Sequence, residues 1–172
     1  MGAAISKAIG SGATYTVTVT TGTGSGTLGL NVPVTASITD LASNSLGSLP
    51  FTSGENYIID KTAPSIISIV VADPNPTSAA NARFTVTFSE PVAGVDSNDF
   101  ALHIIGNING AIVSNVNGFG NVYTVTVNTG TGNGKFRLDV PVTAAITDLA
   151  GNPLKGLPFT SGETYRKTKP HR

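Results

Sequence analysis

Cysteine and tryptophan are both absent from the 172-residue sequence. A chain without cysteine forms no disulfide, holds no metal through thiolates and has no cysteine nucleophile. A chain without tryptophan lacks the indole ring that commonly forms the stacking platform of a sugar site. Charge is scarce too, because only 12% of the residues are charged and ten basic side chains balance ten acidic ones. Nucleic-acid binding requires an excess of lysine and arginine, so this balance argues against a nucleic-acid partner.

Long apolar runs and catalytic motifs are missing as well. No stretch approaches the roughly 20 apolar residues of a membrane-spanning helix, and the sequence opens without a secretory leader. Neither G-x-S-x-G nor H-E-x-x-H occurs in the sequence. His103 alternates with apolar residues in a predicted strand and is expected to face outward, while His171 lies in the C-terminal tail. We therefore expect neither an enzyme nor membrane insertion.

What the sequence does contain is an internal repeat. Residues 2–57 align without a gap to residues 110–165, and 36 of the 56 aligned positions are identical. A period near 100 residues is too long for a solenoid and is typical of tandem globular modules. Pro64 stiffens the short connection that follows the first copy and restricts the residue before it to extended geometry.

The two copies differ in completeness. The N-terminal copy has no counterpart of residues 62–109, so we expect residues 1–61 to be the C-terminal half of a repeat. Residues 62–167 are expected to form one complete repeat, and residues 168–172 form a divergent tail. The chain therefore has the organisation of a segment from a longer array, in which neighbouring repeats are its partners.

Alternating apolar and polar residues predict β-strands throughout the complete copy. The stretches Phe84–Phe88, Tyr123–Val127 and Lys135–Val140 alternate with the period of two that half-buried strands show. Clusters of glycine, asparagine, aspartate and proline separate these stretches from four other strand-like runs, at Ile66–Val71, Phe100–Ile105, Ala111–Val116 and Phe159–Tyr165. About seven short strands in about 100 residues predict an all-β fold, an antiparallel β-sandwich.

The glycine-spaced stretch after Tyr15–Val19 resembles a nucleotide-binding loop only superficially. Gly22, Gly24 and Gly26 follow G-x-G-x-G spacing, whereas a dinucleotide loop needs G-x-G-x-x-G before a helix and a P-loop ends in G-K-[ST]. The chain returns here as another strand, so a hairpin turn is the better interpretation.

Three stretches in fixed order resemble bacterial Ig-like domains: TAPSIISI, FTVTFSEPVAGVDSNDF and ITDLAGNPL, which begin at Thr62, Phe84 and Ile146. The resemblance covers the complete copy and, for its second half, residues 2–61. It implies an Ig-like sandwich of about seven strands, preceded by half of a second one. It also implies a non-catalytic role as a structural spacer in a secreted or cell-surface protein, and hence an extracellular location.

One turn of the incomplete copy departs from the pattern. Ser43 and Ser45 stand where the complete copy has Gly151 and Pro153. If the glycine has a positive φ, the serine at the same place carries about 1 kcal/mol of strain.

A ligand-binding adhesion module, calcium-dependent or carbohydrate-binding, is the alternative function. Calcium takes several oxygen ligands from loops. Six residues near the linker and the turns are candidate ligands: Asp60, Glu90, Asp96, Asp99, Asp148 and Asn152. The competing interpretation is that these side chains cap turns, as aspartate and asparagine commonly do. No established calcium motif is present, so we expect no cofactor.

The incomplete copy predicts one further property. It lacks the strands that would cover its apolar face, and uncovered strand edges pair with other chains. We therefore expect the whole chain to self-associate through residues 1–61.

Overall fold

The computed structural model describes residues 2–169. The chain divides into two compact units, Met1–Thr62 and Ala63–Arg172. Both are built from β-strands, and one short 3-10 helix, Ser97–Asp99, interrupts the second. The all-β prediction is therefore confirmed. Among the described residues, no helix has the length and apolar character needed to cross a membrane. His171, in the predicted tail, lies outside the described residues.

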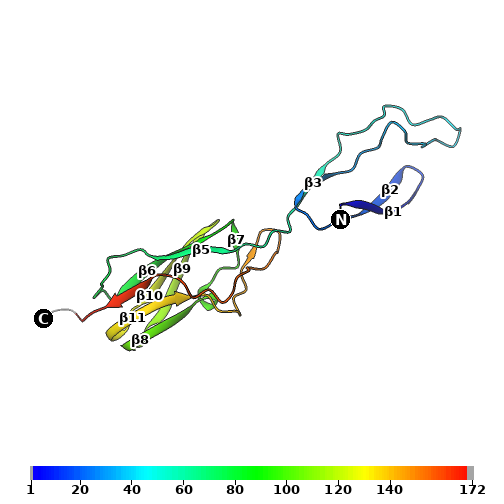
Figure 1. Cartoon of the computed structure of the whole chain (residues 1–172). Coiled ribbons are helices and arrows are strands. Elements are labelled where there is room, and N and C mark those ends of the chain that lie inside the picture. Colours follow the sequence, from blue (N-terminus) through cyan, green and yellow to red (C-terminus); the bar gives the residue numbers. More distant parts are fainter. Residues whose placement is uncertain (1, 170–172) are drawn as a thin grey trace. The chain divides into compact units, whose positions relative to one another are not determined.

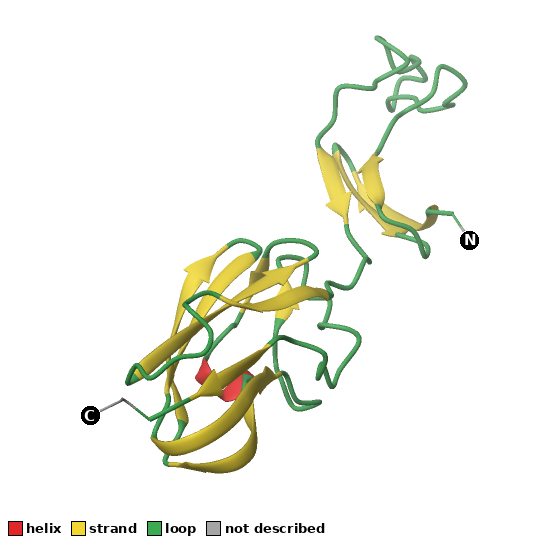
Figure 2. Ribbon diagram, turned by 60° about the vertical axis from the view of Figure 1, so that its left-hand side comes forward, coloured by secondary structure: helices red, strands yellow, loops and turns green. Residues whose placement is uncertain are grey.

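The second unit is a sandwich of two antiparallel sheets (Figures 1 and 2). The larger sheet has the order β5-β6-β10-β9, with the bounds Ile66–Val71, Asn81–Phe88, Val122–Asn128 and Ile112–Phe119. The smaller sheet has the order β13-β11-β8, with the bounds Thr164–Lys167, Thr131–Asp139 and Ala101–Asn109. Two short strands, β7 (Val92–Ala93) and β12 (Thr147–Asp148), form a separate antiparallel pair. The two main sheets together have seven strands, as predicted for an Ig-like sandwich.

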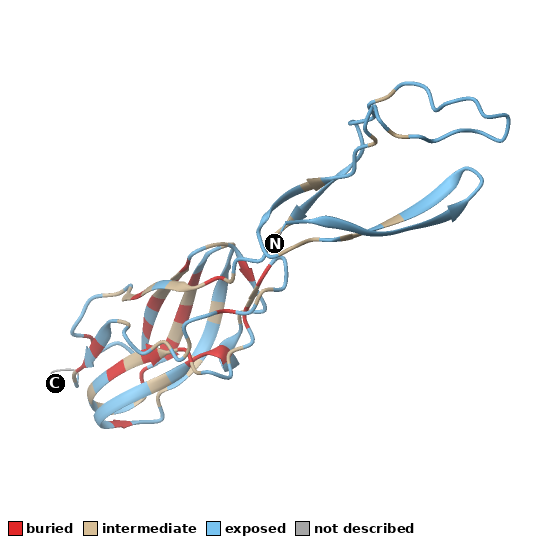
Figure 3. Ribbon diagram, turned by 45° about the vertical axis from the view of Figure 1, so that its right-hand side comes forward, coloured by how far each residue is buried: buried red, intermediate tan, exposed pale blue. Residues whose placement is uncertain are grey.

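The apolar faces of the two sheets meet in one core. The ring of Phe84, on β6, stands edge-on to Phe136 of β11 at 6.0 Å and to Tyr165 of β13 at 5.0 Å between centroids. All three side chains are fully buried, and Figure 3 shows buried positions alternating with exposed ones along these strands. Because the strands alternate with period two, threonine takes the outer face and the aromatic and branched residues fill the core.

One expected strand is shorter than predicted. The run Phe159–Tyr165 is a strand only from Thr164 onward, and Phe159 forms an isolated bridge with Val140. Three features account for this: Pro158 precedes the run, Gly162 lies within it, and the backbone N–H of Glu163 is bonded to Ile69 O of β5 instead of to a ladder partner.

The first unit repeats the local structure of the second half of the sandwich. It contains two antiparallel pairs, β1 with β2 and β3 with β4, whose bounds are Ala4–Ser11, Thr14–Thr20, Gly26–Gly29 and Asn56–Ile59. In the alignment of the two copies, β1, β2 and β4 coincide end for end with β9, β10 and β13. Strand pairing in this half therefore follows from its own sequence.

Burial differs sharply between the copies. Tyr15 is 62% exposed where its counterpart Tyr123 is 8% exposed, and Tyr57 is 68% exposed where Tyr165 is fully buried. Figure 3 accordingly shows β1 to β4 as largely exposed. Because the counterparts of β5, β6 and β8 are absent from the first unit, its apolar face has no second half to pack against.

Candidate functional site

Asp148 organises the turn after β12. Its Oδ1 accepts hydrogen bonds from the backbone N–H groups of Ala150, at 2.9 Å, and Asn152, at 2.8 Å. Its Oδ2 accepts a third from the side-chain amide of Asn152 at 2.7 Å. The bond from the Asn152 side chain is the main reason why the pKa of Asp148 is lowered, and the backbone N–H groups lower it further. These bonds are those of an aspartate that caps its own turn.

The same turn forms in the incomplete copy. Asp40 accepts hydrogen bonds from the backbone of Ala42 at 2.9 Å and of Asn44 at 2.8 Å, and from the Asn44 side-chain amide at 2.9 Å. The pKa of Asp40 is lowered for the same leading reason, the bond from its asparagine. Since this turn forms in both copies, it does not depend on the rest of the sandwich.

Asp96 and Asp99 cap the 3-10 helix. Asp96 Oδ1 accepts from Asn98 N at 2.7 Å, and Asp99 Oδ2 accepts from Asp96 N at 2.8 Å. The Asp96 side chain also accepts from the backbone of Asp99, which completes a capping box. Asp99 is only 4% exposed, and its Oδ1 accepts from Ala145 N at 2.8 Å. Its Oδ1 thus ties this helix to the loop before β12, while its Oδ2 caps the helix itself.

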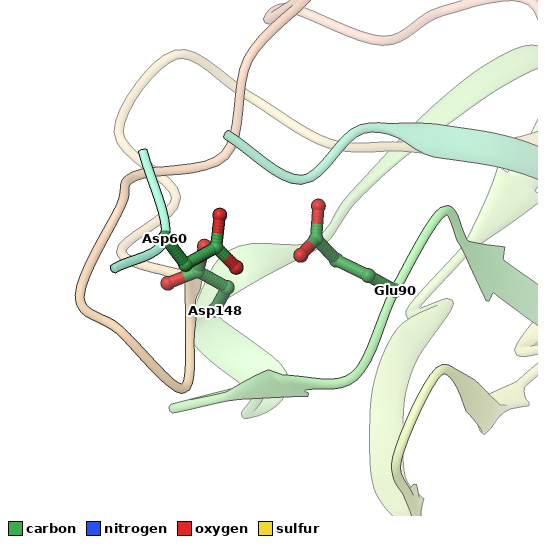
Figure 4. A group of neighbouring side chains, drawn as sticks. All are labelled: Asp60, Glu90 and Asp148. Carbon is green, nitrogen blue, oxygen red and sulfur yellow. The ribbon is translucent and has the colours of Figure 1, made fainter. Parts of the chain in front are cut away.

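Two acidic candidates from different loops of the second unit, Glu90 and Asp148, also lie close together. A carboxylate oxygen of Glu90 lies within 4.8 Å of one of Asp148, and Figure 4 draws both with Asp60. Glu90 is half-buried and follows β6, while Asp148 is buried at the end of β12. Calcium takes 6–8 oxygen ligands, so this pair alone would supply a small part of a coordination sphere.

Asp60 belongs to the first unit and bonds within it. Its Oδ1 accepts from Thr62 N at 2.9 Å and from Ser25 Oγ at 3.3 Å. Ser25 Oγ also accepts from Lys61 N at 2.9 Å. These bonds hold the turn after Gly24 against the segment that follows β4. Asp60 therefore also forms the bonds that are typical of an aspartate in a turn.

Three further side chains among the described residues, one aromatic and two basic, bear on the sequence predictions. His103 is exposed on β8 opposite Arg137 of β11, so the prediction that it faces outward is confirmed. Phe119, at the end of β9, is 89% exposed and was not singled out by the sequence analysis. Lys167 was also missed. It is 7% exposed, and its Nζ donates to Thr129 Oγ1 at 2.6 Å.

Comparisons with known proteins identify the family of the chain. A search of curated proteins found no match. Among solved structures, the N-terminal part of the bacterial S-layer protein SbsC is similar, with 20% sequence identity and a TM-score of 0.42. This match covers 64% of the present chain and 24% of the S-layer chain. A family model described as a bacterial Ig-like domain matches residues 60–161. These residues make up more than half of the chain and include every strand from β5 to β12, and the chain therefore belongs to the bacterial Ig-like domain family.

Proposed function

We propose that the chain is a non-catalytic structural module, a spacer in a repetitive secreted or cell-surface protein. The observation that carries the proposal is the path of the chain through the complete unit. The chain enters β5 at one end of the sandwich and leaves after β13 at the opposite end (Figures 1 and 2). Modules with opposed ends can be joined in series, and the repeat of residues 2–57 at residues 110–165 supports such an arrangement.

Direct bonds between the first and last parts of the unit fit a load-bearing role. Val71 N donates to Glu163 Oε2 at 2.8 Å, and Glu163 N donates to Ile69 O at 2.9 Å. The Tyr165 hydroxyl accepts from Asp73 N at 2.7 Å and donates to Arg83 O at 2.8 Å. A pull on the two ends of the unit must break these bonds before the sheets separate.

Force spectroscopy of the full chain tests the proposal. Held by its two ends, the chain should show one discrete unfolding event in which residues 63–169 extend from their folded length to about 360 Å, at about 3.4 Å per residue. Tyr165→Phe should lower the unfolding force, because it leaves the part-buried N–H of Asp73 without its partner and removes one of the two bonds to Arg83 O. Tyr57→Phe, at the matching exposed position, should leave the force unchanged. A chain that lengthens smoothly without such an event would contradict the spacer role.

A calcium-dependent adhesion module is the second candidate, and the Glu90–Asp148 pair is the observation that favours it. Calcium would raise the melting temperature of the chain, and a chelator would reverse the effect. Glu90→Gln should abolish this response, because it removes a charge without changing the shape of the side chain. An unchanged melting temperature at millimolar calcium would contradict the calcium-dependent module. The acidic residues would then serve only to cap turns.

A further inference from the structure

The free edge of β2 lies where the complete copy holds β6. In the second unit, β10 pairs with β9 on one edge and with β6 on the other. In the first unit, β2 corresponds to β10 and pairs with β1, which corresponds to β9. Within residues 2–169, the other edge of β2 therefore has no strand beside it. Its unpaired N–H and C=O groups form a template for another strand.

The face beside this edge is apolar. Tyr15, Val17 and Val19 of β2 line a cleft together with Leu28 of β3 and Tyr57 of β4. Each of these residues has a buried counterpart in the complete copy. A strand that pairs with the free edge and points apolar side chains to the same side would extend this face into a core.

The sequence of β2 has the pattern that this edge accepts. The β6 strand presents F-T-V-T-F over Phe84–Phe88, and β2 presents Y-T-V-T-V over Tyr15–Val19. In both strands an aromatic residue and a central valine point to one side, and threonine points to the other. The β2 strand also contains no charged residue and no proline, which are common protections against edge pairing.

We propose that two copies of this chain associate through their β2 strands. Each β2 then pairs with the free edge of the other β2, in the way that β6 pairs with β10 in the complete unit. The register can be transferred from the complete copy, where Val125 lies opposite Phe84 and Thr124 lies opposite Thr85. When Tyr15 replaces Phe84, Thr16 lies opposite Thr16 of the second copy, and Val17 lies opposite its Tyr15. The pairing is antiparallel and two-fold symmetric, as a closed homodimer requires.

The resulting sheet has the order β1-β2-β2-β1, in place of β9-β10-β6-β5. One strand pair with its adjoining side chains forms an interface smaller than the 1,200–2,000 Å² that is typical of stable complexes. The dimer is therefore weak, and its population depends on protein concentration.

Substitutions at Thr16 test both the interface and its register. Because this residue faces its own copy across the two-fold axis, Thr16→Lys and Thr16→Glu each place like charges opposite one another. By sedimentation over a hundredfold concentration range, each variant alone should dimerise about tenfold more weakly than the unaltered chain. An equal mixture of the two should recover dimerisation, because lysine then lies opposite glutamate. Thr124→Lys is the matched control, since strands flank β10 on both edges, and it should dimerise like the unaltered chain.

Three outcomes would overturn the proposal. The first is an unaltered chain that stays monomeric at every concentration. The second is a mixture of the two charged variants that does not recover dimerisation, which would place a different residue opposite Thr16 or a different surface at the interface. The third is a monomeric chain that binds a synthetic peptide of residues 80–90, which would make a β6-type strand, instead of a second β2, the occupant of this edge.

Discussion

Gly151 and Ser43 occupy the same turn position in the two copies, and both have a positive φ, 88° for the glycine and 68° for the serine. The strain predicted at Ser43 depended on a positive φ at Gly151, and that condition is met. A second pair behaves in the same way, since Gly156 has a φ of 78° and the aligned Ser48 a φ of 57°. The incomplete copy therefore has two serines in a conformation that favours glycine.

Gly151→Ser should destabilise the complete unit by about 1 kcal/mol, the usual cost of placing a side chain in the left-handed region. No atom lies within 4 Å of the Cβ that the serine would add, so backbone strain is the only cost. Chemical denaturation would measure the change. Gly120→Ser, also at a positive φ and in open space, should cost a similar amount. A neutral effect at both positions would show that backbone strain is not the cost.

Asp148 should make the complete unit sensitive to acid. Its pKa is lowered in the folded chain, chiefly by the bond from Asn152, so the stabilisation is fully present above the pKa of the unfolded chain. It is lost as the pH falls through the lower pKa of the folded chain. Melting curves of the unaltered chain and of Asp148→Asn should therefore differ most near neutral pH and converge in strong acid. A difference that does not change with pH would exclude this contribution.

At the scale of the strand, matching inward-facing positions are buried to different extents in the two copies. Phe136 of β11 is fully buried between the sheets, while its counterpart Leu28 of β3 is only half-buried. Phe136→Ala should cost the complete unit about 3–5 kcal/mol, because it leaves a cavity in the core. Leu28→Ala should leave the main melting transition unchanged. If the two substitutions lowered that transition equally, the first unit would have a packed core that its exposed side chains do not indicate.

The elements show how far the sequence could predict the structure. Period-two alternation identified β6, β10 and β11 and their inward residues, because alternation along a strand is a local property of its sequence. An apolar run predicted β5. If the alternation is followed to the end of β13, it also predicts that Lys167, two residues after Tyr165, faces inward. It could not distinguish Tyr15 from Tyr123, which lie in the same five-residue sequence. Burial depends on a second sheet, and that information lies elsewhere in the chain.

The candidate site was predictable to a similar extent. Aspartate in a turn predicted capping, and the bonds of Asp96 and Asp148 are those of caps. The approach of Glu90 to Asp148 was not predictable, because it depends on the path of two loops that are distant in sequence.

At the scale of the whole molecule, the two units contain the same half-domain in two states. In Ala63–Arg172, the strands that correspond to the first unit are covered by β5, β6 and β8 and form a closed core. In Met1–Thr62, the strands pair but their apolar face stays open. Completeness of the sandwich, and not the sequence of the strands, therefore decides their stability.

Hydrogen exchange on the full chain, at a concentration where it is monomeric, tests this claim most directly. The amides of Tyr123–Val127 should exchange slowly, because they open only when the sandwich unfolds. Those of Tyr15–Val19 should exchange far faster despite the identical sequence, because β2 has one unpaired edge and little burial. Equally slow exchange of the two segments in a strict monomer would contradict the account, since the first unit would then be stable without the missing strands.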